Sequence, residues 1–132
     1  MTKNVFLFPG QGSQSVGMMD SLAEQFPQVR DTFNQASDVL GIDLWALAHE
    51  GPAETLNQTE ITQPALLAAG IATWRAWQAA GGAMPDILAG HSLGEYTALV
   101  AAGRIDFKDG IGLVAARGRL MQAAVPPGTG AM

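Results

Sequence analysis

The sequence predicts an α/β fold in which a parallel sheet is flanked by helices. Two short apolar runs have the length and composition of buried strands, Val5–Phe8 and Asp86–Ala89. Each run leads into a glycine-containing turn, and long segments with helical periodicity lie between and after the two runs. Strands separated by helical segments are typical of a parallel sheet, because a crossover helix returns the chain to the edge at which the first strand began.

Helices are predicted in order after the first strand. A short helix is expected over residues 18–26. Pro27 suits the first turn of a second helix, and Gly41 is the residue expected to end it. Asp43 can cap a short third helix that includes Leu44 to Leu47.

The second half of the chain has its own helix signals. Thr62 is the expected N-cap of a long helix that runs to about residue 80, with Pro64 tolerated in its first turn. A helix over 95–102 is expected after the second strand. Asp106 is the expected N-cap of a last helix over 107–124, which the prolines that follow would end.

Composition excludes several classes of protein. The 132 residues suffice for a single core, and no window of eighteen apolar residues or signal peptide is present. The absence of cysteine excludes disulfides, thiolate metal sites and a cysteine nucleophile, and it suits a reducing cytoplasm. With two histidines and a net charge of −5, neither a histidine-rich metal site nor a nucleic-acid partner is expected. We therefore expect a cytoplasmic protein that binds neither membrane nor metal.

Ser92 lies at the centre of Gly-His-Ser-Leu-Gly, directly after the second predicted strand and before a helix. This order is typical of a nucleophile elbow, a sharp turn that presents a serine hydroxyl at the edge of the sheet. Small flanking residues are needed because the turn leaves no room for Cβ atoms. The N–H of Leu93 would then point to where an oxyanion forms. A turn with an incidental serine remains the alternative.

The first strand runs into a second glycine-containing loop, Pro9–Gln14. Loops that follow parallel strands share the carboxyl edge of the sheet, so this loop is expected near Ser92. It can supply a second oxyanion donor, the N–H of Gln11. A phosphate-binding loop is the alternative, although the Lys-Ser/Thr pair of a P-loop and the third glycine of a dinucleotide fingerprint are both missing.

Three segments in series resemble the malonyl-CoA:acyl-carrier-protein transacylases, most closely the stand-alone bacterial type. They are Phe8–Gln14 (FPGQGSQ), Ile61–Ala65 (ITQPA) and Gly90–Tyr96 (GHSLGEY). The resemblance covers essentially the whole chain. It implies an α/β-hydrolase-like subdomain, incomplete here, into which a ferredoxin-like subdomain is inserted. Residues 1–127 would belong to the first subdomain, and residues 128–132 would begin the insertion.

The resemblance also assigns substrate-binding residues. Arg117 matches the position of the family's malonyl-binding arginine, and a guanidinium can hold a carboxylate through two parallel hydrogen bonds. From spacing alone, a surface arginine paired with an acidic residue is the favoured interpretation, and the positional match reverses that preference. Gln63 is a further candidate to line the site. His91 is another candidate, although supporting the turn is its simpler role.

The predicted function is therefore acyl transfer by a ping-pong route. A malonyl group would pass from malonyl-CoA through a Ser92 ester to the phosphopantetheine thiol of acyl carrier protein, with no metal or redox cofactor. No histidine follows Ser92 in the chain, although hydrolase-like elbows take their base from downstream. The remaining C-terminal half of the same protein is thus an expected partner. A serine hydrolase or thioesterase with the same elbow, and a non-catalytic fragment, are the alternatives.

Overall fold

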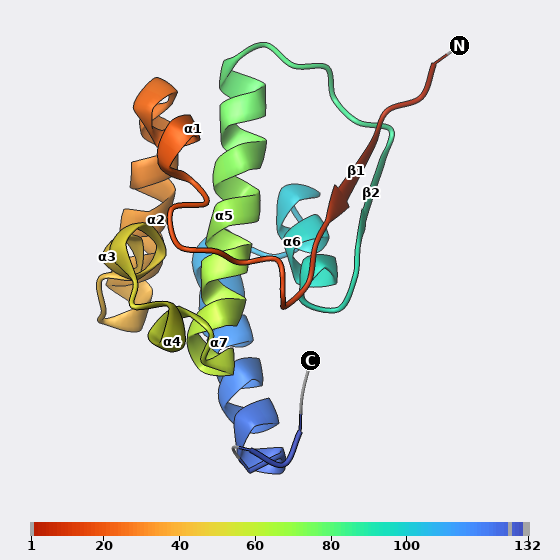
Figure 1. The fold of residues 1–132 in the computed structure, drawn as a ribbon. Coiled ribbons are helices and arrows are strands. Elements are labelled where there is room, and N and C mark those ends of the chain that lie inside the picture. The colour runs from red at the N-terminus through yellow and green to blue at the C-terminus, as the bar shows by residue number, and fades with distance from the viewer. Residues whose placement is uncertain (1, 127, 131–132) are drawn as a thin grey trace.

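The computed structural model describes residues 2–126 and 128–130. Among these residues, five helices lie between the two strands, and two more follow the second strand. In chain order they are β1 (Val5–Phe8), α1 (Asp20–Gln25), α2 (Pro27–Leu40), α3 (Leu44–Glu50), α4 (Ala53–Leu56), α5 (Thr59–Ala79), β2 (Ile87–Gly90), α6 (Leu93–Ala101) and α7 (Phe107–Ala124). Helix α5 stands in the middle, with α1–α4 on one side and the strands with α6 on the other (Figure 1).

The two strands pair in parallel, which confirms the predicted α/β class. Val5 lies opposite Ile87, and Phe8 lies opposite Gly90. The second strand starts at Ile87, one residue later than predicted, and the carboxylate of Asp86 just before it accepts a hydrogen bond of 2.8 Å from the backbone N–H of Asn4. Both strands therefore end level with each other, and the two glycine-containing turns leave the sheet side by side.

One face of the sheet is covered and the other is open. Phe6 packs edge-on against Trp74 and Trp77 at centroid distances of 5.5 and 5.3 Å. On the opposite face Val5, Leu7 and Ile87 are 49%, 74% and 51% exposed. This alternation follows from the two-residue period of a strand. Within the described residues, α5 and α6 thus cover a single face.

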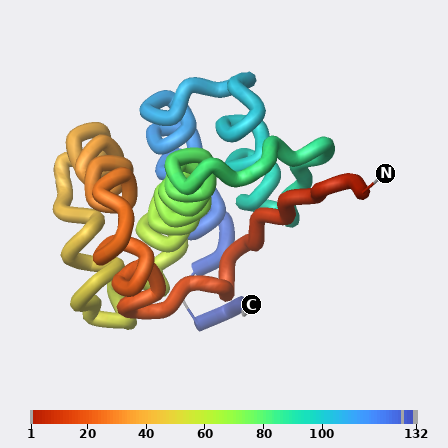
Figure 2. Tube along the Cα trace, turned by 90° about the horizontal axis from the view of Figure 1, so that it is seen from above, coloured from red at the N-terminus to blue at the C-terminus, as the bar shows by residue number. Residues whose placement is uncertain are grey.

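The core lies among helices rather than on the sheet. Helix α5 is buried on nearly all sides, as expected of a helix that is apolar all round, and α2, α6 and α7 surround it (Figure 2). The largest fully buried apolar side chains come from the six helices α2–α7; they include Phe33, Leu44, Leu56, Leu67, Leu93 and Ile111. The core of the described residues is therefore centred on α5.

The predicted start of α5 is wrong. The helix begins at Thr59, with Gln58 as its N-cap residue. Thr62 lies inside the helix, where its hydroxyl donates to the backbone oxygens of Leu56 and Gln58. This back-bonding ties the end of α4 to α5, a local option that Thr has besides capping. Pro64 consequently sits beyond the first turn.

Other boundaries differ by less. Hydrogen-bonded turns occupy the residues just before Asp20, so helix α1 begins at Asp20 rather than at 18. It ends at Gln25, because the proline at 27 favours an extended conformation at Phe26. Helix α4 was not predicted. Helix α6 begins at Leu93 rather than at 95. The predicted caps Asp43 and Asp106 are confirmed, because each carboxylate accepts a backbone N–H from the first turn of its helix.

The break predicted after α7 coincides with the end of that helix at Ala124. Pro127, at the boundary predicted between subdomains, lies outside the described residues, as do residues 131–132. The division at 127/128 therefore stays a prediction. No helix in the part of the chain that the structure describes combines the length and apolarity that a membrane crossing needs.

Candidate active site

Ser92 occupies the turn between β2 and α6 in a strained conformation. Its φ and ψ are 54° and −112°, and among the described residues it is the one non-glycine residue with a positive φ. Such a conformation is costly for an L-residue and is found mainly at functional sites. It is the backbone geometry that a nucleophile elbow requires. The serine side chain is partly exposed.

Gly94 explains how the elbow fits against the sheet. A Cβ atom at this position would overlap the carbonyl oxygen of Phe8, the last residue of β1. Helix α6 therefore starts directly on the end of the neighbouring strand, which only a glycine permits. The N-terminus of α6, and with it the N–H of Leu93, is thereby fixed relative to Ser92.

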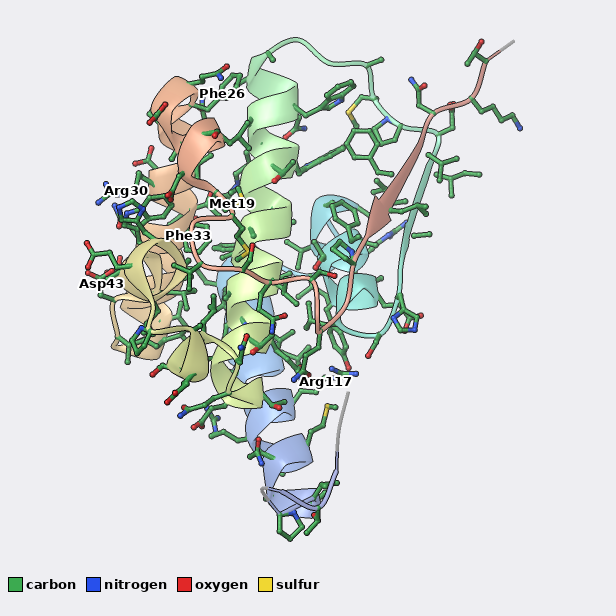
Figure 3. All side chains as sticks on the ribbon, viewed as in Figure 1. Met19, Phe26, Arg30, Phe33, Asp43 and Arg117 are labelled. Atoms are coloured by element: carbon green, nitrogen blue, oxygen red, sulfur yellow. The ribbon has the colours of Figure 1, made fainter. Side chains whose placement is uncertain are left out.

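Arg117 reaches the elbow from α7. Its Nη1 donates to Oε1 of Gln63 at 2.8 Å, and its Nη2 donates to Oγ of Ser92 at 3.3 Å. The guanidinium also lies over the ring of Tyr96, 5.3 Å from the centroid. In Figure 3 the side chain lies just below the turn that follows β1. Within the described residues no carboxylate forms an ion pair with Arg117, so the predicted alternative of an acidic partner does not occur.

Gly118 allows Arg117 to come this close. A Cβ at position 118 would lie 2.7 Å from Cα of Glu60 and 2.8 Å from the carbonyl oxygen of Thr59. Helix α7 thus packs directly on the first turn of α5. Because Gln63 lies one turn further along α5, the arginine that precedes Gly118 meets its amide.

Gln63, which the sequence predicts to line the site, is buried behind Arg117 in the structure. Its side chain is 0% exposed, with Oε1 accepting from Arg117 and Nε2 donating to the sulfur of Met121 at 3.2 Å. A fully buried amide cannot touch a substrate unless its neighbours move. Its place is behind Arg117, where it holds the guanidinium toward Ser92. Sequence reasoning also missed Tyr96 and Met121, although Tyr96 ends the third motif.

The Gln11 loop lies against the elbow, as predicted. A Cβ atom built on Gly10 would be 3.5 Å from Cβ of Ser92. The Gln11 side chain points away and donates to Oγ1 of Thr59 at 3.0 Å. Within the described residues no hydrogen bond uses the backbone N–H of Gln11 or of Leu93. In the part of the chain that the structure describes, both N–H groups are therefore left without a backbone acceptor, one in the loop beside the elbow and one at the start of α6.

Neither histidine hydrogen-bonds to Ser92 among the described contacts. His91 is exposed, and its Nδ1 lies beside Gly10, 3.2 Å from a Cβ atom built there. This position suits support of the turn. His49 lies on α3, where its Nδ1 is 2.6 Å from the Asp20 carboxylate and its ring stacks on Trp45. No group of three or more metal-ligating side chains occurs within residues 2–126 and 128–130.

An open cleft of about 1030 Å³ adjoins this arrangement. It lies between the loop at 11–14, the segment 54–60 and the end of α7. Gln11 and Met121 border both the cleft and the contacts around Ser92. A smaller hollow of about 410 Å³ surrounds Arg75 toward the other end of α5. Burial lowers the pKa of Arg75, partly offset by the Asp106 carboxylate.

A protein-family model described as an acyl transferase domain matches residues 5–132. The chain belongs to this acyl transferase family. It is 61% identical over its whole length to the malonyl CoA-acyl carrier protein transacylase of Salmonella typhimurium. Among solved structures, the acyl carrier protein S-malonyltransferase of Vibrio cholerae matches 97% of the chain with a TM-score of 0.93 and 63% identity.

A second solved structure similar to this acyl transferase chain is a malonyl-transacylase in complex with a type II polyketide synthase acyl-carrier protein. It matches 95% of the chain at 62% identity, with a TM-score of 0.92. The matches span only part of each relative. The chain covers 43% of the Salmonella protein, 42% of the Vibrio structure and 40% of the complexed transacylase.

Proposed function

We propose that this chain carries the nucleophile, the oxyanion donors and the carboxylate-binding arginine of an S-malonyltransferase. The observation that carries the proposal is the 3.3 Å contact between Arg117 Nη2 and Ser92 Oγ. A guanidinium that has no carboxylate partner among residues 2–126 and 128–130, and that lies beside a strained serine, suits an acyl group that ends in a carboxylate. Malonyl has that carboxylate, whereas acetyl and ordinary ester substrates lack it.

In the proposed reaction, Ser92 Oγ attacks the thioester carbonyl of malonyl-CoA. A C–O bond forms, and the carbonyl oxygen becomes an oxyanion between the N–H groups of Gln11 and Leu93. The C–S bond then breaks, and the sulfur leaves with the proton that Ser92 gave up, so that a malonyl-Ser92 ester remains. Preorganised backbone donors of this kind contribute about 10²–10³-fold each to the rate.

In the second half-reaction the phosphopantetheine thiol of acyl carrier protein attacks this ester. The proton of the thiol returns to Ser92, and malonyl leaves on the carrier. Arg117 holds the malonyl carboxylate through both steps, while Gln63 and Tyr96 keep the guanidinium in place. No atom changes oxidation state, so the reaction needs no redox cofactor. The backbone donors would polarise the thioester carbonyl, a role that a metal ion can serve in other enzymes.

Serine needs a general base to act as a nucleophile. Because neither histidine of this chain hydrogen-bonds to Ser92 within the described residues, we infer that the base comes from polypeptide outside residues 1–132. The relatives are long enough to contain such a base elsewhere, since the chain covers 43% of the Salmonella protein. The remaining portion of a protein of that length is thus a proposed partner, together with malonyl-CoA and acyl carrier protein.

The proposed pathway is fatty acid biosynthesis in the cytoplasm. The absence of cysteine suits a reducing compartment. A polyketide carrier is the other acceptor to test, because the transacylase described above is in complex with one. Both carriers would present the same phosphopantetheine thiol to the Ser92 ester.

A chimera tests the proposal. Residues 1–132 of this chain replace the matching segment of the Vibrio cholerae S-malonyltransferase, to which they are 63% identical. With malonyl-CoA and acyl carrier protein, the chimera is expected to yield malonyl-carrier. With Ser92→Ala, transfer is expected to disappear. Release of free malonate in place of malonyl-carrier would instead support the hydrolase alternative.

A further inference from the structure

One side chain, that of Gln14, fastens the loop that carries the Gln11 N–H. Both polar atoms of its amide take part. Oε1 of Gln14 accepts the backbone N–H of Gly12 at 2.8 Å. Nε2 of the same side chain donates to Oδ1 of Asn57 at 2.8 Å. Gln14 therefore spans from the turn beside Gln11 to the residue that ends α4.

A second contact joins the same two segments. Nε2 of Gln11 donates to Oγ1 of Thr59, the first residue of α5. Asn57 and Thr59, which lie two residues apart, thus each accept a hydrogen bond from a side chain of the loop. The segment that contains Asn57 and Thr59 is held by contacts of its own. The Thr62 hydroxyl donates to backbone oxygens within it or next to it, and Gly118 packs against its backbone.

The same segment also leads to the malonyl-binding arginine, since Gln63 follows on the next turn of α5. Segment 57–63 is therefore the common support for the loop on one side and for Arg117 on the other. The loop has no other side-chain hydrogen bonds to α4 or α5 among the described contacts. The loop backbone has a positive φ of 108° at Gly12, and the Gln14 amide oxygen accepts the N–H of this residue.

From these contacts we infer that Gln14 and Asn57 are positioning residues, which hold the Gln11 N–H at the point where the oxyanion forms. The inference rests on the proposed function. Gln14 acts through the loop and touches no reacting atom. Because catalysis depends steeply on where an oxyanion donor lies, loss of the clamp is expected to slow the chemical step and leave substrate binding unchanged.

The first test is Gln14→Ala in the chimera. We expect kcat for malonyl transfer to fall about 10–100-fold with KM within a factor of two, as for displacement of one oxyanion donor. The matched control is Gln78→Ala, an exposed glutamine at the far end of α5, which should leave both constants unchanged. The loss should be the same factor for malonyl-CoA and acetyl-CoA, because the oxyanion is common to both donors.

Charge variants separate the clamp from a general effect on folding. Gln14→Glu keeps an acceptor for Gly12 N–H, and its second oxygen can accept from the Asn57 amide after that amide turns over. Asn57→Asp keeps the acceptor for Gln14 Nε2. Each single variant should stay within about threefold of the parent kcat, whereas the double variant sets two carboxylates against each other and should lose as much as Gln14→Ala.

The outcomes are distinct. A Gln14→Ala chimera with parent kcat, a loss confined to KM, or a double charge variant as active as its singles would each overturn the clamp while the parent chimera still transfers malonyl. A parent chimera that transfers none would contradict the proposed function, and the clamp with it. Circular dichroism melting of every variant shows that the comparisons are made between folded proteins.

Discussion

Arg117 donates a hydrogen bond of 2.8 Å to Gln63, a side chain with no exposed surface that lies 54 residues earlier in the chain. This hydrogen bond to a buried amide restricts the conformations open to the Arg117 side chain. Its other end meets Met121, one helical turn beyond Arg117 on α7. The amide therefore joins α5 to α7 and aims the guanidinium at Ser92.

Replacing Gln63 with Leu should weaken malonyl transfer about 10–100-fold, since a hydrogen bond to a charged group contributes about 1.5–3 kcal/mol. Uncharged acyl donors should be much less affected. The measurement is kcat/KM of the chimera for malonyl-CoA and for acetyl-CoA. Gln35→Leu is the matched control, because Gln35 accepts from Arg75 at 3.1 Å in the same way, far from Ser92. Equal losses in the two variants would show that Gln63 serves stability alone.

Replacing Arg117 with Ala should remove the preference for malonyl while sparing transfer of uncharged acyl groups. Loss of a bidentate contact to a carboxylate should cost about 2–4 kcal/mol of transition-state binding. Arg119→Ala is the control, because this exposed arginine lies two residues on and points about 200° around an ideal helix. The ratio of malonyl to acetyl transfer is the quantity to follow. An unchanged ratio in Arg117→Ala would exclude the assigned role.

The helix crossing that places Arg117 can be tested through two glycines of α7. Gly118→Ala should destabilise the chimera by about 1–3 kcal/mol, because the added Cβ meets the backbone of α5. Gly112→Ala should stabilise it by about 0.5–1 kcal/mol, since its Cβ meets nothing nearer than 4.0 Å and alanine favours a helix. Denaturant melts measure both. A stabilising Gly118→Ala would contradict the close crossing.

The sequence predicts those features that depend on neighbours in the chain. The elbow at Ser92, the caps Asp43 and Asp106 and the strand Val5–Phe8 each follow from a few adjacent residues. Arg117 was placed by resemblance, since spacing alone left an acidic partner open.

Features that depend on distant contacts were missed. Thr62 has the residue type of a cap, yet its hydroxyl is taken by the end of α4. The burial of Gln63 and the approach of Tyr96 to Arg117 arise only when α5, α6 and α7 pack together. Gln14 and Asn57 lie 43 residues apart, so no local pattern predicts their hydrogen bond.

The open face of the sheet predicts how the 132-residue chain behaves by itself. Val5, Leu7 and Ile87 expose apolar surface on that face, so the chain alone should be marginally ordered or aggregate, and should transfer no malonyl. Sedimentation velocity and circular dichroism melting test its state, with and without the remaining portion of the Vibrio protein in trans. A monomer with a cooperative melt and full activity alone would assign the base to His91 or His49.

The proposed function depends above all on malonylation of Ser92. The most direct measurement is peptide mass spectrometry of the chimera after brief exposure to malonyl-CoA without a carrier protein. We expect a malonyl ester on the peptide that contains Ser92, its absence in Ser92→Ala, and its loss when acyl carrier protein is added. A malonyl group on a different residue, or an unmodified Ser92 in a chimera that still transfers malonyl, would contradict the account.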